Sequence, residues 1–262
     1  MTRGLFEGIP LVVVLLATAV ALLIAAGAGY RLGARARTRN RGSTADMGTI
    51  MGGLLGLLGL MLAFTFGMAG QRFDHRRELV VEEANAIGTA WLRTDLIPEP
   101  MRGRARETLR AYVHVRFEAA SSGSVEAFLA GASARSEQLQ GVLWGIAAEA
   151  ASASPTPTTA LFVTAVNEVI DMHGRRFAAA VRSPIPPIIF GTLYAVSFLV
   201  LLALGFMRGL TGDGSALATS LLSVVLAVVL ALILDLDRPF EGYLKVGQGA
   251  MRDLRTMMDA AR

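Results

Sequence analysis

The chain has 262 residues, of which 53% are hydrophobic and 18% are charged, and its formal net charge is +4. This hydrophobic content is higher than a soluble protein of this length needs for its core. The 25 basic residues include a single lysine, Lys245, and form no stretch interleaved with aromatic residues, which argues against a nucleic-acid partner. Cysteine is absent, which excludes disulfide bonds, thiol catalysis and cysteine metal sites.

Four uncharged stretches are long enough to cross a bilayer. They cover residues 9–30, 47–70, 188–207 and 215–234. A helix rises 1.5 Å per residue, so about 20 residues cross a hydrocarbon core of about 30 Å. The first stretch ends in small residues that suit signal-peptide cleavage, but it is longer than a signal-peptide core and follows only Arg3, balanced by Glu7. We expect it to be retained as a membrane anchor, and the protein to be an integral membrane protein with four transmembrane helices.

The segment between the second and third spans has helical periodicity. Val80, Ala84, Ile87 and Trp91 form one apolar stripe at spacings of four, three and four. Prolines and cap residues, including Thr156 before Pro157, divide the segment into helices over about 72–96, 101–120, 124–150 and 157–181. Apolar and polar residues do not alternate strictly anywhere, so we expect an all-α fold without a sheet.

This pattern predicts four parts in the chain. Residues 1–70 hold transmembrane helices 1 and 2, 71–187 form a helical extramembrane domain, 188–235 hold helices 3 and 4, and 236–262 form an amphipathic tail, helical over 243–262. Basic residues near the ends of the spans do not fix the orientation. The loop over 31–46 is dense in arginine, but with Arg208 its side has six basic residues against ten on the other side.

The second span carries small residues along one face. They recur every three or four positions: Gly48, Gly52, Gly56, Gly59, Ala63, Gly67 and Gly70. Glycine in a helix costs about 1 kcal/mol relative to alanine, so this repetition needs a reason. One interpretation is close packing against another span or subunit, and the other is the wall of a narrow pore. The two are compatible in an oligomer.

A charged segment follows this span. Glu82 and Glu83 lie about 100° apart on a helix, so they do not converge on one ligand. The simplest interpretation is a set of ion pairs one turn apart on a solvated helix, with Asp74 and Glu78 among them. Asn85 lies close to the apolar stripe, so we expect it to bond a neighbouring helix or subunit. Residues 71–83 have a net charge of −1, which does not predict an anion funnel.

The end of the fourth span offers Asp235 and Asp237, followed by Arg238. Their oxygens are suitable ligands for calcium, but a charged helix end with an Asp–Arg pair is the simpler interpretation. The three histidines are dispersed, and the sequence has no nucleophile motif or phosphate loop. We therefore expect neither catalysis, a metal site nor a cofactor. No span carries a charge in its middle, which argues against a proton relay.

Three stretches resemble the bestrophin-like bacterial membrane proteins, a family distantly similar to bestrophin anion channels. They are LAFTFGMAGQRFDHRR at 62–77, EEANAIGT at 82–89 and LDLDRPF at 234–240. They contain the polar residues of the family's signatures: Arg72, Asp74, Arg76, Glu82, Glu83, Asn85, Asp235, Asp237 and Arg238. Lys245 follows where bestrophins have an acidic run, so the resemblance does not imply calcium gating.

The resemblance implies a homo-oligomer, pentameric in bestrophins, in a bacterial inner membrane, with the helical domain and both termini in the cytosol. It also implies an ion channel that conducts anions, with a pore lined by the second span. The alternative hypothesis is a non-conducting scaffold or sensor whose helical domain binds a partner protein.

Overall fold

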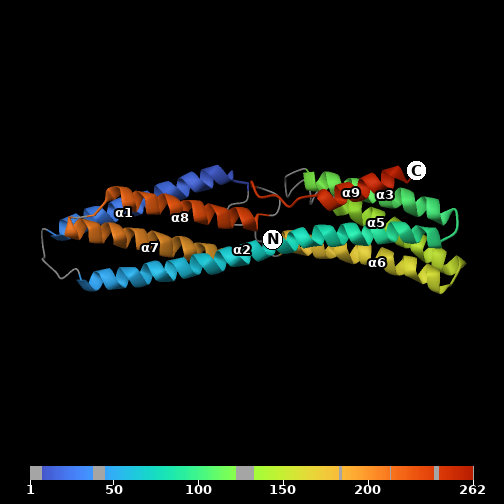
Figure 1. Cartoon of the computed structure of the whole chain (residues 1–262), viewed down its shortest axis with the longest axis horizontal. Coiled ribbons are helices and arrows are strands. Elements are labelled where there is room, and N and C mark those ends of the chain that lie inside the picture. The colour runs from blue at the N-terminus through green and yellow to red at the C-terminus, as the bar shows by residue number, and fades with distance from the viewer. Residues whose placement is uncertain are drawn as a thin grey trace. The chain divides into compact units, whose positions relative to one another are not determined.

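A computed structural model of the chain describes residues 8–37, 45–121, 133–182, 185–212, 214–238 and 242–261, which form helices and the segments that connect them (Figure 1). No strand occurs within these ranges. The chain divides into two compact units. Unit 1 comprises residues 1–72 and 184–238, and unit 2 comprises residues 73–183 and 239–262.

Unit 1 contains α1 (Leu11–Arg37), the first half of α2 (Ala45–Arg93), α7 (Pro187–Thr211) and α8 (Ala216–Asp237). Each of these four helices is long and apolar enough to cross a membrane. The hydroxyl of Ser215 accepts a hydrogen bond from the backbone N–H of Ala218 at 3.2 Å and so caps α8. The expectation of four transmembrane helices is confirmed, although α1 continues to Arg37, well beyond the first uncharged stretch.

Glycines bring α1 and α7 into backbone contact. A Cβ at Gly29 would collide with the carbonyl oxygen of Leu202, and one at Gly33 with that of Phe206. A Cβ at Gly205 or Gly209 of α7 would likewise collide with the backbone of α1. This is close packing of the small-xxx-small type, and the order of the contacts shows that the two helices run parallel. Their carboxyl ends therefore lie at the same end of unit 1.

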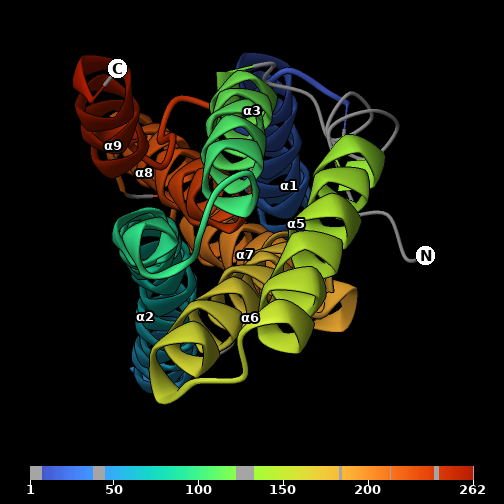
Figure 2. The ribbon, with the colours of Figure 1, turned by 90° about the vertical axis from the view of Figure 1, so that its right-hand side faces the viewer.

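Unit 2 contains the second half of α2, η1 (Thr94–Leu96), α3 (Met101–Ser121), α5 (Ser133–Ala153), α6 (Pro157–Phe177), η3 (Ala178–Arg182) and α9 (Gly249–Ala260). Its five longest helices are labelled α2, α3, α5, α6 and α9 in Figure 2. All five contribute to one apolar core, with Ile87, Tyr112, Ile146, Phe162 and Met251 almost completely buried.

The helix ends agree with several expectations and correct others. Thr156 caps α6 by accepting a hydrogen bond from the N–H of Thr159 at 3.2 Å, and Pro157 occupies the first turn, as expected. The expected helix over 124–150 is described only from Ser133, because residues 122–132 lie outside the described residues. The tail is helical only over Gly249–Ala260, so the expectation of a helix from residue 243 was wrong.

Candidate functional site

The glycine face of α2 has no neighbour within its own chain. A Cβ built on Gly48, Gly52, Gly56, Gly59, Gly67 or Gly70 would meet no heavy atom within 4 Å. Ala63, on the same face, is exposed. The opposite face of α2 is buried, with Met51, Leu58, Thr65 and Ala69. Packing of these glycines against another span is therefore not made within the described part of one chain.

Beyond Gly70, the same side of α2 carries charged and polar residues. Asp74, Glu78, Glu82 and Asn85 follow at spacings of four, four, four and three, and all are exposed. Arg77 lies on the same side and is also exposed. Asn85, expected to bond a neighbouring helix or subunit, is exposed on this chain, and no hydrogen bond of its amide is among those of the described residues.

Glu83, by contrast, lies on the buried face of α2 at the centre of a polar cluster. Its carboxylate accepts hydrogen bonds from Nε of Arg116 at 2.9 Å, from Nη1 of Arg176, and from the hydroxyl of Tyr112 at 3.3 Å. The amide nitrogen of Gln140 donates to the same hydroxyl at 3.1 Å. The interpretation of this charged segment as a solvated helix is therefore wrong for Glu83, which is completely buried. We call these residues, with His173, the Glu83 cluster.

Electrostatics fix the protonation states in this cluster. Burial alone raises the pKa of Glu83, but the guanidinium groups of Arg176 and Arg116 outweigh it, so the pKa is lowered and the carboxylate is charged. Burial, followed by the charge of Arg116, lowers the pKa of His173 to about 4. Its Nδ1 is buried and has no hydrogen-bond partner among the described residues. The carboxylate of Glu83 thus pairs with the buried guanidinium group of Arg116 and with the half-buried one of Arg176.

Sequence reasoning missed this cluster because its members lie on four helices. Arg116 is on α3, Gln140 on α5 and Arg176 on α6. One signal was available in the sequence: Glu83 follows Val80 by three residues and precedes Ile87 by four, so it falls on the apolar stripe of α2. A charged residue at such a position needs a buried partner.

The acidic end of α8 forms its own contacts in unit 1. Both carboxylate oxygens of Asp237 accept from the backbone N–H of Ile185 at 3.1 Å, and Nη1 of Arg72 lies 3.9 Å away. Arg238 donates from Nη1 to the carbonyl of Ile9 at 2.9 Å, and Asp235 is 2% exposed. These contacts favour the charged helix end over a calcium site, and they include an ion pair between Asp237 and Arg72 of α2.

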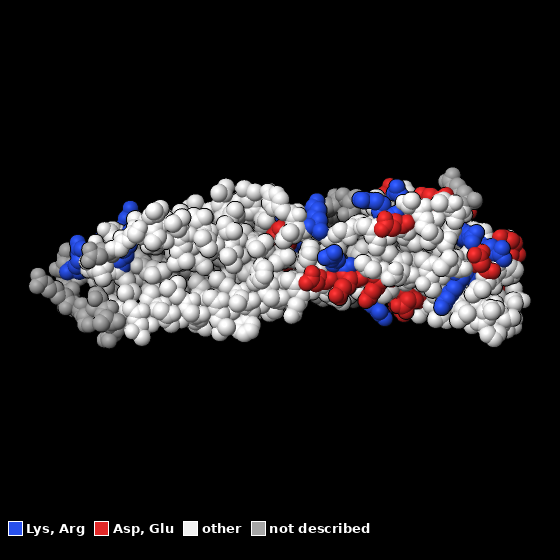
Figure 3. Space-filling view, in the orientation of Figure 1, with Lys and Arg blue, Asp and Glu red and all other residues white. Residues whose placement is uncertain are grey.

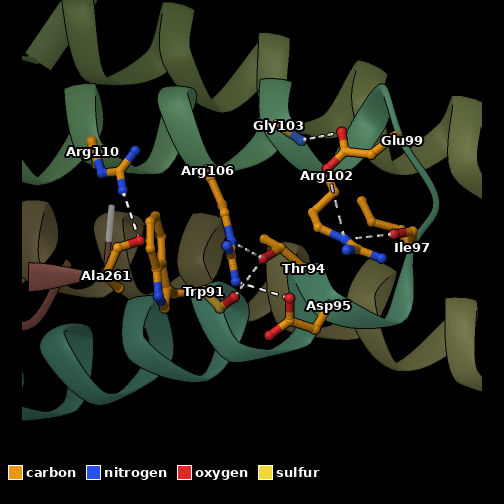
Figure 4. Close-up of polar contacts among 10 residues, drawn as sticks. All are labelled: Trp91, Thr94, Asp95, Ile97, Glu99, Arg102, Gly103, Arg106, Arg110 and Ala261. Atoms are coloured by element: carbon orange, nitrogen blue, oxygen red, sulfur yellow. Dashed lines mark hydrogen bonds and ion pairs between the residues drawn. The ribbon is translucent and has the colours of Figure 1, made fainter. Parts of the chain in front are cut away.

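Two arginines of α3 stack on Trp91, and Figure 4 shows how they are held. The guanidinium carbons of Arg106 and Arg110 lie 5.0 and 4.8 Å from the indole centroid. Arg106 also binds Asp95 at 2.8 Å. Arg110 donates a hydrogen bond to the carbonyl of Met258 at 3.2 Å and so links α3 to the last turn of α9. These contacts join α3 to η1 and to α9.

The fold and these contacts define a multi-pass membrane protein with four spans and a helical extramembrane unit. It is similar to a mutant of a bacterial bestrophin homologue from Klebsiella pneumoniae, with 17% identity, 95% of this chain and 97% of that chain covered, and a TM-score of 0.66. A second structure of a Klebsiella pneumoniae homologue, phased with zinc, gives 15% identity, 95% coverage of both chains and a TM-score of 0.62. No curated protein sequence matches the chain.

The family model for the Bestrophin-like domain matches residues 15–251, and the chain belongs to this family. The resemblance noted from three short sequence stretches is thereby confirmed, as are the all-α fold and the membrane location. Family and fold together suggest a membrane ion channel.

Proposed function

We propose that the protein is an oligomeric ion channel in which copies of α2 surround a common pore. The observation that carries this proposal is the open glycine face. A Cβ at Gly52, Gly56 or Gly59 would touch nothing in the chain, so the contacts within one chain give no reason for glycine there. A ring of copies supplies that reason, because bare backbone permits close approach and leaves room for ions.

The residues beside the glycine face suit contacts between copies. Leu60 and Phe64 are exposed by 53% and 66% on one flank, and Phe66 by 43% on the other. Large apolar side chains next to a strip without side chains allow one copy to pack into the next. The pentamer implied by the resemblance is part of the proposal, as is the pore-lining role of the seven small residues.

The sign of the conducted ion is a separate part of the proposal. The resemblance to bestrophins implies anions. The exposed side of α2 beyond Gly70 carries Asp74, Glu78 and Glu82 against Arg77, and these charges favour cations if they border the ion path. A reversal potential measured under a salt gradient separates the two.

The proposed orientation places unit 2 in the cytosol of a bacterial cell, with the spans in the inner membrane. Four spans put both termini on the same side as unit 2. The chain has no native cysteine, so single cysteines report on the side directly. We expect Thr38→Cys to react with an impermeant thiol reagent from outside spheroplasts and Gly123→Cys to be protected. Labelling of Gly123→Cys from outside would reverse the orientation.

The proposal is tested by conductance of the purified protein in planar bilayers. We expect ion current from the unaltered chain and its loss in Gly59→Leu, which places a side chain on the open face. Gly191→Leu is the matched control, because Gly191 on α7 is also exposed and has nothing within 4 Å. Absence of current over a range of pH and calcium, or a monomeric native particle, would overturn the proposal.

The second candidate function is a non-conducting scaffold or sensor that binds a partner protein through unit 2. Trp144 and Val142 on α5 favour it, because they are exposed by 45% and 48% outside the spans. Exposed tryptophan is frequent in protein interfaces. An oligomeric protein that carries no current would support this second function.

A further inference from the structure

The exposed side of α5 has no charged residue in its middle, although this helix lies outside the spans. Between Glu137 and Glu149 the sequence carries no charge. Elsewhere unit 2 has many charged side chains, as the face drawn in Figure 3 shows. The helix α3 has the same length as α5 and exposes charged residues along it: Arg104, Glu107 and Glu118. A water-exposed helix does not need such an uncharged side for its own solubility or folding.

The composition of this side is that of a protein interface. Val142 and Trp144 lie at its two edges and are about half exposed. Between them are Gly141 and Gly145, where a Cβ would have nothing within 4 Å. Exposed tryptophan and a lack of charges are typical of the part of an interface that a partner covers. We call residues 138–148 on the exposed side the α5 face.

The second half of α2 has a similar exposed side. No charged residue lies between Glu83 and Arg93. On the exposed side of this stretch are Asn85, Thr89 and Leu92, and Leu92 is 65% exposed. We call these three residues the α2 face. It continues the side of α2 on which the open glycines lie.

The two faces belong to helices on opposite sides of unit 2. In Figure 2, α2 lies at the left and α5 at the right, with α3 and α6 between them. A two-fold contact uses the same face of both copies, whereas a closed ring joins two different faces of each copy. Two uncharged faces on opposite sides therefore suit a ring, in which each copy offers one face to each neighbour.

The two faces also lie at the same height along the helices. The hydroxyl of Tyr112 bonds both Glu83, at 3.3 Å, and Gln140, at 3.1 Å. Near the start of α3, two arginines bind Asp95, just after α2, and Glu149, on α5, at 2.8 and 2.7 Å. The two helices thus run in the same direction, and the uncharged stretches that follow Glu83 and Gln140 cover the same height. Rotation about an axis along the helices joins surfaces of equal height, so this match favours a second copy over a different protein.

We propose that the α5 face of one copy packs against the α2 face of the next copy in a ring. Trp144 then lies at the height of the next copy's Asn85 and Thr89, and Ala148 at the height of its Leu92. The contact covers the exposed tryptophan and brings the exposed amide of Asn85 to another subunit. The proposal rests on the oligomer of the proposed function and is independent of conduction.

Cross-linking of the full chain in membranes tests this contact, since the chain has no native cysteine. Gly141→Cys combined with Asn85→Cys, treated with a short bis-maleimide, should give a ladder of linked subunits on a denaturing gel. Each single variant should give none. Ala111→Cys with Asn85→Cys is the matched control, because Ala111 is exposed on α3 next to Tyr112 and thus at a similar height. An equal ladder in the control, or a ladder from Gly141→Cys alone, would overturn the proposal.

The native mass of the cysteine variants separates this contact from the oligomer itself. A native oligomer without a ladder overturns the contact alone, whereas a monomer overturns the proposed function as well. In a dilution series in detergent, Trp144→Glu should weaken association of the subunits about tenfold or more, as for a tryptophan central to an interface. Met257→Glu, at a similarly exposed apolar residue of α9, is the control and should associate as the unaltered chain does. Equal association of the two variants overturns the contact and assigns the α5 face to a different protein.

Discussion

Unit 1 contains two glycine-bearing surfaces that have opposite surroundings. On α1, Gly29 and Gly33 lie against the backbone of α7, where no side chain fits. On α2, Gly52 and Gly56 have only open space before them. The spacing of four residues is the same in both pairs, so the pattern alone does not distinguish packing within the chain from a surface kept open. The difference shows that the α1–α7 contact serves folding, and it makes α2 the surface to examine for function.

The two faces of α2 repeat this contrast in unit 2. Glu82 and Glu83 are neighbours in sequence, yet Glu82 is exposed and Glu83 is completely buried between two arginines. One carboxylate belongs to the open side and the other to the core. Adjacent substitutions therefore separate stability from function.

The largest effect is expected at the α1–α7 contact. Gly33→Leu forces the two backbones apart, and we expect at least about 3 kcal/mol of destabilisation or no folded protein. Gly27→Leu on the same helix is the control, because nothing lies within 4 Å of a Cβ there. Size-exclusion profiles and thermal unfolding in detergent measure both. Equal behaviour of the two variants would show that this contact does not hold the spans together.

The next effect concerns the buried carboxylate. Glu83→Gln leaves Arg116 and Arg176 without their compensating charge, so we expect a loss of about 3–5 kcal/mol. Glu82→Gln, one residue away on the exposed face, should change the free energy of unfolding by less than about 0.5 kcal/mol. Chemical unfolding of the two variants tests this. Similar values for both would contradict the burial of Glu83.

A smaller effect depends on pH and on His173. Its pKa is about 4 in the folded chain and 6.5 ordinarily, so the unfolded chain takes up this proton first as the pH falls. The stability due to neutral His173 is complete above pH 6.5 and is lost towards pH 4. We expect a value at pH 5 that is roughly 1–2 kcal/mol below that at pH 7.

Unfolding of His173→Gln across this range is the measurement. The variant should lack this decrease. The pKa of Glu83 is lowered from its ordinary value of 4.5, so its contribution is lost only at still lower pH and should persist in the variant. An unchanged decrease between pH 6.5 and 5 would assign the acid sensitivity to other groups.

The smallest effect on stability is expected on the open side of α2, where the effect on conduction should be clearest. Asp74→Asn with Glu78→Gln removes two exposed carboxylates, and stability should stay within about 0.5 kcal/mol. If they border the ion path, the reversal potential under a salt gradient should move towards anion permeation. Arg104→Gln, an exposed arginine paired with Glu149, serves as the control. An unmoved reversal potential would place the path elsewhere.

Local patterns in the sequence predicted most of the fold. The uncharged stretches gave the spans, and the stripe of Val80, Ala84, Ile87 and Trp91 gave the buried face of α2. Thr156 and Pro157 gave the start of α6. These features depend on residues within a few turns of one another, which is why they were accessible without the structure.

The contacts between distant segments were not predicted. The spacing of Gly29 with Gly33 and of Gly205 with Gly209 was present in the sequence, but only the structure shows that the pairs face each other. Arg116 and Arg176 lie 33 and 93 residues from Glu83. The open face of α2 either packs against another subunit or lines a pore. The choice depends on molecules outside the chain, so neither the residue spacing nor the structure of a single chain decides between the two.

The stacking of Arg110 over Trp91 gives the molecule an optical reporter. The chain has two tryptophans, and Trp91 is 2% exposed whereas Trp144 is 45% exposed. Replacing Trp144 by phenylalanine leaves a single indole emitter beneath the guanidinium that also binds the carbonyl of Met258. Its emission maximum and quenching by iodide would follow the release of the carboxyl-terminal helix in real time, without an attached dye.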